Sequence, residues 1–437
     1  MAKNGKNRLA ILTIFRFRRT DFKNNASSGQ NRINSLGAVH SIYSYLLSFM
    51  QFADRLQPLQ SNVFAYMDIA KSQVKASGMA VIDLSLGSSD LPTDRFILEE
   101  IAAALTDPTT HGYSLFGSTL DFRKTVAAWM QTRFGVTVDP EAEVLPLIGS
   151  QEGTAHLPLA LLNPNDFALL QDPGYPSHYG GIYLAGGQVY GMPLLAENNF
   201  LPVFADIPET VLAKSKLMVL SYPHNPTAAT ATLEFFQSAA QFCQEHHLAL
   251  AHDFPYVDLV FDGSTPPSML QADRDLNVSI EFFTMSKSYN MGGFRVGFAV
   301  GNRELIKALR QIKAVVDFNQ YQGIMRGAIK ALNSDRTPIE HVVNTFQARR
   351  DVMIDALKAI GWEVPHPIAT MYLWAKLPER YAHNSVGFCL DLIKSTGVAL
   401  APGSGFGKHG EGYVRFALVH PPEVLRDAAT KIGTFLH

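Results

Sequence analysis

The sequence is poor in cysteine, in excess charge and in long apolar runs, and each absence excludes a class of protein. Two cysteines among 437 residues, Cys243 and Cys389, can form neither a disulfide framework nor a cysteine-rich zinc site, which favours a reducing compartment. A formal net charge of −2 gives no reason to expect nucleic acid or another polyanion as a partner. No apolar stretch of the sequence reaches the roughly 20 residues that cross a bilayer, so we expect a soluble, cytoplasmic protein.

The composition indicates a globular chain with an unusual beginning. Hydrophobic residues make up 47% of the sequence and charged residues 17%, and a chain of this length suggests two or three domains. Residues 1–49 carry eight basic residues against one acid, Asp21, so they contribute +7 and residues 50–437 sum to −9. This basic extension could be a targeting peptide, a disordered tail, or upstream sequence before a start at Met50. Its irregular composition favours the disordered tail or the upstream start.

Short apolar segments alternate with amphipathic ones from about residue 56 onward, without internal repeats. The pattern predicts strands over 80–84, 144–148, 167–171, 188–192, 217–220, 248–252 and 280–285. It predicts helices over 95–105, 121–134, 177–185, 233–246 and 303–316, with another beginning at residue 150. Such alternation is typical of an α/β fold, in which helices cover both faces of a mostly parallel sheet. Beyond it, helices over 340–360, 386–395 and 422–436 mix with strands over 371–375 and 413–418, which indicates a smaller α+β domain.

Small residues follow the expected strand 144–148, where Gly149, Ser150 and Gln151 open a helix. In open α/β sheets, ligands bind beyond the carboxyl ends of the strands. Backbone N–H groups and the positive end of a helix dipole can bind a phosphate at such a turn. The turn has neither the Walker lysine spacing nor the GxGxxG spacing, so no nucleotide is indicated. An ordinary strand-to-helix turn is the alternative.

One lysine, Lys287, follows the mostly apolar segment 280–285, and a lone arginine, Arg295, lies eight positions later. Burial lowers the pKa of an ammonium group and frees the amine to attack carbonyl carbons. Lys287 is therefore the best candidate nucleophile in the chain. A lysine just past a strand end can also face solvent.

Other strand ends carry aromatic and polar groups. Tyr175 lies between two prolines and could stack on a flat ligand or cap the core. Asn225 lies among conformationally restrained residues, and Asp253 is followed by Tyr256. A carboxylate at the end of a buried strand is costly unless it meets a cation or hydrogen-bond donors, so a structural salt bridge is the alternative for Asp253.

Together these groups place a phosphate cradle, a stacking ring, an amide, a carboxylate, a phenol and an amine at sheet edges, which is the set that pyridoxal phosphate requires. From about residue 56, the chain resembles the class I and II pyridoxal-phosphate-dependent aminotransferases of fold type I, nearest the aspartate, alanine and LL-diaminopimelate aminotransferase subgroup. The resemblance rests on SYPHNPT at 221–227, the Asp253–Tyr256 pair and SKSYNMGGFRVG at 286–297.

The resemblance implies a mostly parallel seven-stranded sheet between helices and a smaller α+β domain. It implies an N-terminal arm and part of the small domain over 50–97, a large cofactor-binding domain over 98–335, and a small C-terminal domain over 336–437. It also implies that an amino group of an L-amino acid is moved to a 2-oxo acid by a ping-pong mechanism.

Roles for the residues around the cofactor ring follow from the same resemblance. Lys287 would bind the cofactor as a Schiff base and then move a proton, which makes it the main catalytic residue. Asp253 would keep the ring nitrogen protonated, and Tyr175 would stack on the ring face. Asn225 and Tyr256 would hydrogen-bond the ring hydroxyl, so Tyr256 joins Lys287 and Asp253 as a catalytic residue.

The phosphate and the substrate have implied partners too. The phosphate would be held by residues at two turns, Gly149, Ser150, Gln151, Ser286 and Arg295. Tyr113, in HGYSLFGS, would reach the phosphate of the neighbouring subunit, which implies a homodimer. Arg415, in YVRFAL, would bind the substrate α-carboxylate, with Gly87 and Asn225 also contacting the substrate.

Two positions depart from the family pattern: Ala228 replaces a common glycine and His224 a frequent asparagine, and neither carries an assigned role. A C–S lyase on the same fold is the alternative activity, because fold does not fix function. A DNA-binding regulator is disfavoured, because residues 1–49 are too short and irregular for a winged helix and linker. No metal is expected, because His156 and His178 lie near the inferred site without an accompanying acid cluster. The sequence does not identify the amino donor.

Overall fold

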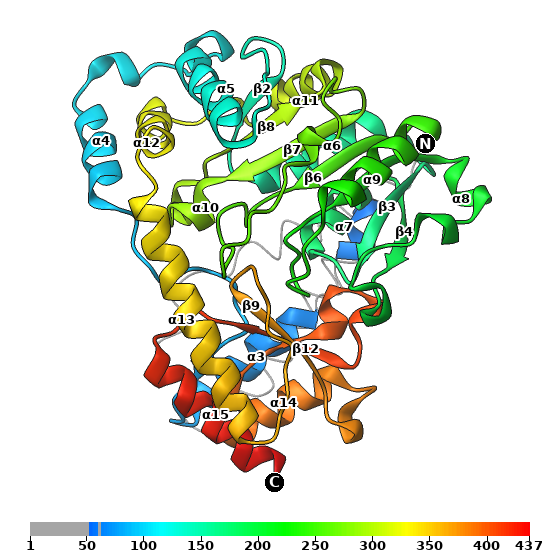
Figure 1. Ribbon diagram of the computed structural model, residues 1–437, viewed down its shortest axis with the longest axis vertical. Helices are drawn as coiled ribbons and strands as arrows, with labels where there is room; N and C mark the ends of the chain where they lie inside the picture. Colours follow the sequence, from blue (N-terminus) through cyan, green and yellow to red (C-terminus); the bar gives the residue numbers. More distant parts are fainter. Residues whose placement is uncertain (1–51, 60–62) are drawn as a thin grey trace, which may run out of the picture. The chain divides into compact units, whose positions relative to one another are not determined.

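The computed structural model describes residues 52–59 and 63–437 (Figure 1). Arg55–His437 form one compact unit. The basic extension 1–49 lies outside the described residues, so its predicted disorder stays a prediction. No helix within 52–59 and 63–437 is long and apolar enough to cross a membrane.

A seven-stranded sheet forms the larger part of the fold, in the order β2-β8-β7-β6-β5-β3-β4. Within this sheet β8 runs antiparallel to both of its neighbours, and the remaining pairs are parallel. The mostly parallel seven-stranded sheet is therefore confirmed. Its strands are β2 Val144–Leu147, β3 Phe167–Asp172, β4 Gln188–Pro193, β5 Ser215–Leu220, β6 Ala249–Asp253, β7 Ser279–Thr284 and β8 Gly297–Gly301.

Helices cover both faces of this sheet, since neighbouring residues of one strand enter different cores. Phe282 of β7 packs with the cluster that contains Leu157 and Leu309, whereas Phe283 packs with the cluster that contains Phe122 and Met325. The helices are α4 Arg95–Leu105, α5 Leu120–Phe134, α6 Ser150–Leu161, α7 Pro176–Leu184, α8 Glu209–Leu212, α9 Leu233–Glu245, α10 Met285–Ser288, α11 Arg303–Val316 and α12 Gln322–Leu332. The prediction missed α8, α10, α12 and β8.

A separate core contains the C-terminal elements together with an N-terminal helix. Met67 and Val74 of α3 pack in one cluster with Leu373 and Phe416 of a three-stranded antiparallel sheet, β11-β12-β9. Figure 1 shows β9 and β12 beside α3, α13, α14 and α15, away from the seven-stranded sheet. The elements are α3 Val63–Ala76, α13 Thr337–Ala359, β9 Tyr372–Lys376, α14 Ser385–Thr396, β11 Ala401–Pro402, β12 Tyr413–Ala417 and α15 Pro422–Leu436.

The strand expected over 80–84 is shorter than predicted and lies outside the main sheet. β1 spans Ile82–Asp83 and pairs in parallel with β10, Val398–Ala399, as a two-stranded sheet. Its apolar residues, Ile82 and Leu84, pack into the C-terminal core rather than between the helices of the large sheet. A short apolar run carries no information about which sheet it joins, which explains the error.

Candidate active site

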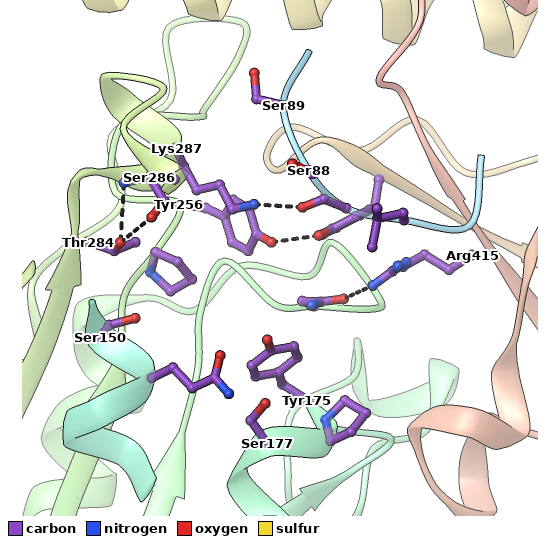
Figure 2. A pocket seen from close by; sticks show the side chains of 18 of the residues that line it. Ser88, Ser89, Ser150, Tyr175, Ser177, Tyr256, Thr284, Ser286, Lys287 and Arg415 are labelled. Carbon is purple, nitrogen blue, oxygen red and sulfur yellow. Dashed lines mark hydrogen bonds between the residues drawn. The ribbon is translucent and has the colours of Figure 1, made fainter. Parts of the chain in front are cut away.

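A cavity of about 590 Å³ lies where the carboxyl ends of the parallel strands meet the C-terminal core. Lys287, Tyr175 and Arg415 approach it from three different elements (Figure 2). The predicted site residues that line it are Gly87, Ser150, Gln151, Tyr175, Asn225, Asp253, Tyr256, Ser286, Lys287, Arg295 and Arg415. Two predicted residues, Gly149 and Tyr113, are not part of this lining.

The Lys287 amine faces the cavity and not bulk solvent. The helix α10 begins directly after β7, where the Thr284 hydroxyl accepts a hydrogen bond from the Ser286 N–H at 3.2 Å. Lys287 Nζ donates to the carbonyl oxygen of Gly87 at 2.7 Å (Figure 2). Burial lowers the pKa of Lys287, and the positive charges of Arg415 and Arg295 lower it further, against an opposing influence of Tyr372. The amine is thus suited to act as a nucleophile and as a base.

Asp253, the last residue of β6, presents one unsatisfied oxygen. Its Oδ2 lies 3.1 Å from Nε2 of His178, whereas its buried Oδ1 has no hydrogen-bond partner in the part of the chain that the structure describes. A buried carboxylate oxygen without a donor is costly. A protonated ring nitrogen would supply the missing donor, so this position fits the pyridine ring of pyridoxal phosphate. The salt-bridge alternative does not account for Oδ1.

The phosphate cradle is closed by an arginine. Gly149 precedes α6 with a φ of 78°, and a Cβ there would lie 2.5 Å from Arg295 Nη2, so a side chain at this position would meet the guanidinium. Arg295 itself has a φ of 53°, a left-handed conformation, and its Nη1 donates to the carbonyl oxygen of Gly292 at 3.1 Å. The N-terminus of α6, Ser286 and Arg295 together suit an anion such as a phosphate.

Arg415 on β12 is buried and only partly satisfied. Its Nη1 donates to Asn225 Oδ1 at 2.8 Å and its Nη2 to the Ser85 carbonyl oxygen at 2.7 Å. Its buried Nε has no partner among the residues described. The guanidinium lies over the ring of Tyr372, 4.2 Å from the centroid. A positive group with an unused donor in a cavity suits a carboxylate.

Tyr175 and Tyr256 lie on different sides of the cavity. Tyr175 precedes α7 and its ring meets His178 edge to face, with centroids 5.5 Å apart. Tyr256 donates its hydroxyl hydrogen to the Tyr372 hydroxyl at 2.9 Å, and burial raises the pKa of Tyr256.

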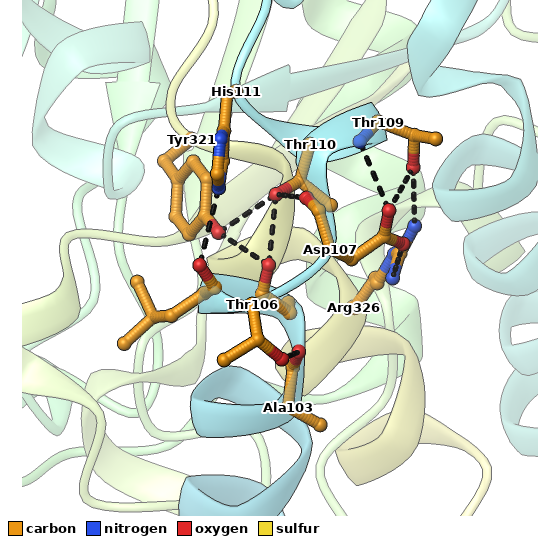
Figure 3. A network of polar contacts seen from close by, with 10 residues as sticks. Ala103, Thr106, Asp107, Thr109, Thr110, His111, Tyr321 and Arg326 are labelled. Carbon is orange, nitrogen blue, oxygen red and sulfur yellow. Dashed lines mark hydrogen bonds and ion pairs between the residues drawn. The ribbon is translucent and has the colours of Figure 1, made fainter.

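Tyr113 is 93% exposed and lies outside the cavity of its own chain. The segment before it is anchored by polar contacts (Figure 3). Thr110 Oγ1 lies 2.8 Å from the Tyr321 hydroxyl, and both bond the Ala104 carbonyl oxygen at 2.9 Å. Asp107 pairs with Arg326 at 2.8 Å, and hydrogen bonds from Thr109, reinforced by Arg326, lower the pKa of Asp107 to about 2. The exposed position of Tyr113 leaves it accessible to another subunit.

Sequence reasoning missed several residues at the site, including Tyr372, His178, Lys71 and Asp68. Tyr372 lies on the edge of the cavity, yet nothing in its local sequence distinguishes it from a core residue of the expected strand 371–375. From the sequence, His178 is considered only as a possible metal ligand and not as a neighbour of the cofactor. Because it lies three positions after Tyr175, helical spacing could have placed both side chains on one face of α7.

The expectation that no acid cluster accompanies His156 was wrong. Glu152, His156 and Asp317 have ligand atoms within 4.8 Å of one another. Lys313, which is fully buried, already lies among them: its Nζ is 2.8 Å from Glu152 Oε2 and 3.2 Å from Asp317 Oδ1. The ammonium group thus contacts both carboxylates and balances one of their two negative charges.

Known proteins with similar sequences and folds are aminotransferases. The family model for aminotransferase class I and II matches residues 80–432. An LL-diaminopimelate aminotransferase of Dehalococcoides mccartyi is 44% identical over 386 residues, which are 88% of this chain and 99% of that protein. A probable N-succinyldiaminopimelate aminotransferase from Thermus thermophilus has a TM-score of 0.81 at 43% identity, over 85% of this chain and 99% of that one. Substrate-bound BacF from Bacillus subtilis has a TM-score of 0.84 at 34% identity, over 88% and 98%.

Proposed function

Since this chain belongs to the class I and II aminotransferases, which are pyridoxal-phosphate-dependent enzymes, we propose that its amino donor is LL-diaminopimelate and its acceptor a 2-oxo acid. The relative from Dehalococcoides mccartyi is named for this activity, and the match covers 88% of this chain and 99% of that protein. The C–S lyase alternative has no observation in its favour.

A cluster of charged residues near Arg415, namely Lys71, Asp68 and Asp83, supports this proposal. Arg415 Nη2 donates to the carbonyl oxygen of Ser85, and Lys71 Nζ lies 3.4 Å from the hydroxyl of the same serine. Lys71 also lies 2.8 Å from Asp68 and 3.1 Å from Asp83, and both Lys71 and Asp68 line the cavity. Beyond the α-carboxylate site, the cavity therefore offers one cation flanked by acids.

This charge pattern matches the far end of diaminopimelate, which carries an ammonium and a carboxylate on one carbon. The acids would accept hydrogen bonds from the distal ammonium, and Lys71 would bind the distal carboxylate. A seven-carbon chain extends about 7–8 Å between its terminal carbons. Arg415 and Lys71 contact the same residue, Ser85, so both cations lie near one part of the cavity and one extended substrate could contact both.

We propose the following division of work around the reacting carbon. Arg415 would bind the α-carboxylate and so orient the Cα–H bond, and the Lys287 amine would take the proton from Cα and pass it to C4′ of the cofactor. Pyridoxal phosphate, once bound, would supply the sink for the electron pair released at Cα. Asp253 Oδ1 would keep the ring nitrogen protonated, which supports that sink.

The remaining assigned residues would hold the cofactor. Gly149, Ser150, Gln151, Ser286 and Arg295 would bind its phosphate, and Tyr175 would cover one face of its ring. Asn225 and Tyr256 would bond the ring hydroxyl, and Gly87 and Asn225 would also contact the substrate. The orphan Oδ1 of Asp253 and the packing of Arg295 against Gly149 support this assignment.

We also propose that the protein is a cytoplasmic homodimer in which Tyr113 reaches the phosphate site of the partner. The 93% exposure of Tyr113 and its anchored segment support the interface role, and the two free, buried cysteines support a reducing compartment. The proposed domain boundaries are 50–97, 98–335 and 336–437, supported by the packing of α3 against the C-terminal sheet.

A single-turnover screen tests the proposed donor. The cofactor-loaded enzyme is mixed with each amino acid and with LL-diaminopimelate, the cofactor absorbance is followed, and the oxo acids are identified by mass. We expect LL-diaminopimelate to react fastest and Lys287→Ala to abolish turnover. A preference for glutamate or alanine over LL-diaminopimelate would reject the proposed donor, and release of pyruvate and ammonia from cystathionine without amine transfer would favour the lyase.

A further inference from the structure

Tyr372, at the start of β9, contacts Arg415, Tyr256 and Gly87, which line the proposed active site. We propose that Tyr372 is a positioning residue of this enzyme, whose ring orients Arg415 and whose hydroxyl orients Tyr256. The side chain is 2% exposed and lines the cavity. The inference rests on the roles proposed above for Arg415 and Tyr256, and not on the identity of the amino donor.

The ring of Tyr372 supports the guanidinium of Arg415 across two paired strands. β9 and β12 are antiparallel, with Trp374 opposite Arg415 and Tyr372 opposite Ala417. Tyr372 and Arg415 are therefore diagonal neighbours, which long side chains can bridge. The guanidinium carbon lies 4.2 Å from the ring centroid, a distance at which an aromatic face attracts a cation. The ring of Tyr372 thus supports Arg415 on one side, and the ring of Phe406, 4.7 Å from the guanidinium carbon, is its second aromatic neighbour.

The hydroxyl of Tyr372 accepts the hydrogen bond of Tyr256 at 2.9 Å, and the two rings are nearly perpendicular. Burial raises the pKa of Tyr256. Burial acts in the same direction on Tyr372, but the positive charges of Arg415 and Lys287 and the hydrogen bond from Tyr256 lower its pKa overall. The two phenols therefore differ: Tyr256 keeps its hydrogen and Tyr372 is the acceptor.

Gly87 connects Tyr372 to the reactive lysine. The Lys287 amine donates to the carbonyl oxygen of Gly87, and a Cβ on Gly87 would collide with the Tyr372 hydroxyl. The hydroxyl consequently packs against the same residue that holds the amine. Tyr372 is in contact with Arg415, Tyr256 and Gly87, so a change in it reaches the substrate side and the cofactor side of the site.

Two substitutions separate the two tasks. Tyr372→Phe keeps the ring under Arg415 and removes the acceptor of Tyr256. The hydroxyl hydrogen of Tyr256 is then free to be donated to the cofactor, and a donor near an oxygen stabilises its anion and lowers the pH at which the cofactor titrates. Tyr372→Leu removes the ring as well, so the Arg415 guanidinium keeps only the ring of Phe406, 4.7 Å from its central carbon, as an aromatic neighbour.

The experiment uses the cofactor-loaded enzyme and two readouts besides turnover. The pH midpoint of the cofactor absorption band reports on the Tyr256 side, and the dissociation constant of propionate, an unreactive monocarboxylate, reports on Arg415. We expect Tyr372→Phe to lower the midpoint while binding propionate within about twofold of the unsubstituted enzyme. We expect Tyr372→Leu to lower the midpoint too and to bind propionate about tenfold more weakly.

Tyr381→Phe serves as the matched control, because it removes a phenol that bonds Asp391 at 3.3 Å and lies outside the cavity lining. An unchanged or raised midpoint in Tyr372→Phe would overturn the hydroxyl role, and unchanged propionate binding in Tyr372→Leu would overturn the ring role. Phenylalanine retains the ring and its packing, so Tyr372→Phe tests the inference even where Tyr372→Leu does not fold. Neither readout uses diaminopimelate, so rejection of the proposed donor leaves this test intact.

Discussion

The buried Lys313–Glu152 pair allows a test of which contacts stabilise the turn at Gly149 and Ser150. Lys313, on α11, places its Nζ 2.9 and 2.8 Å from the two carboxylate oxygens of Glu152, and both side chains are almost completely buried. The Glu152 carboxylate also accepts a hydrogen bond from the N–H of Ile148, immediately before Gly149. The pair therefore fixes the backbone just before Gly149 and Ser150, which we propose to bind the phosphate.

Replacing Lys313 by Met leaves a buried carboxylate without its cation. Removing one partner of a buried ion pair costs about 3–5 kcal/mol, because the remaining charge stays desolvated. Asp317, whose pKa is already raised by burial and by the charge of Glu152, lies beside the same site and adds a second uncompensated acid. Glu152→Gln costs less, about 1–3 kcal/mol. The Lys313 ammonium keeps its ion pair with Asp317, and the amide oxygen of the glutamine can still accept the hydrogen bond from the Ile148 N–H.

The double variant distinguishes the loss of a charge partner from a simple loss of packing. When both charges are removed, Lys313→Met with Glu152→Gln should be more stable than Lys313→Met alone. Lys307→Met is the control, because it breaks an exposed pair with Glu304 on the same helix and should cost no more than about 0.5 kcal/mol.

Urea unfolding of the unsubstituted protein and the four variants gives the stabilities, and fluorescence titration with pyridoxal phosphate gives the affinities. We expect Lys313→Met to weaken cofactor binding as well as to lower the unfolding midpoint. Additive losses in the double variant, or a cost of Lys313→Met no larger than that of Lys307→Met, would refute the reasoning.

Three further predictions concern pH, the partner subunit and the substrate. Burial lowers the pKa of His224 to about 3, so the unfolded chain binds a proton there that the folded chain does not, and stability falls as the pH drops from about 6.5 towards 3. His224→Asn should remove about 2 kcal/mol of this loss at pH 5, measured by urea unfolding against pH, and an unchanged acid limb would contradict it. If Tyr113 acts in the partner's site, co-expression of Tyr113→Ala with Lys287→Ala should restore turnover, because each mixed dimer has one intact site; no recovery would place Tyr113 in its own subunit's site or in none. Lys71→Met should raise KM for LL-diaminopimelate about tenfold or more while leaving propionate binding unchanged, and equal KM values would reject the distal subsite.

Several predicted residues that line the cavity lie at the carboxyl end of a strand or just after it. Lys287 and Asp253 could be found because the carboxyl ends of parallel strands meet at one sheet edge, so local patterns imply spatial neighbours. Tyr372 could not be found in this way. Its partners, Gly87, Tyr256 and Arg415, come from three distant parts of the chain, and the contact depends on the register of β9 against β12.

The same reason explains the errors in the fold. β8, Gly297–Gly301, is short and bounded by glycines, and it takes its place between β2 and β7 only through tertiary pairing. The expected strand 80–84 has a convincing apolar run but no local signal that it pairs with β10. The cluster of Glu152, His156 and Asp317 likewise joins α6 to the end of α11, across more than 150 residues.

The segment from Ser85 to Asp90 links the substrate side of the cavity to the reactive lysine. The Ser85 carbonyl oxygen accepts from Arg415 and the Gly87 carbonyl oxygen accepts from Lys287. Ser89 bonds Asn290, three residues beyond Lys287, and Asp90 pairs with Arg349 of α13. This one stretch of backbone therefore contacts both Arg415 and Lys287.

We predict that a carboxylate bound at Arg415 changes the reactivity of Lys287. Burial is the main cause of the lowered pKa of Lys287, but the charge of Arg415 contributes, so a carboxylate that neutralises Arg415 should raise that pKa. The test is the pH dependence of amine modification at Lys287 in cofactor-free protein, with and without propionate. A shift of the profile to higher pH is expected, and a shift to lower pH would mean that closure around the ligand buries the amine further and that this desolvation outweighs the lost repulsion from Arg415.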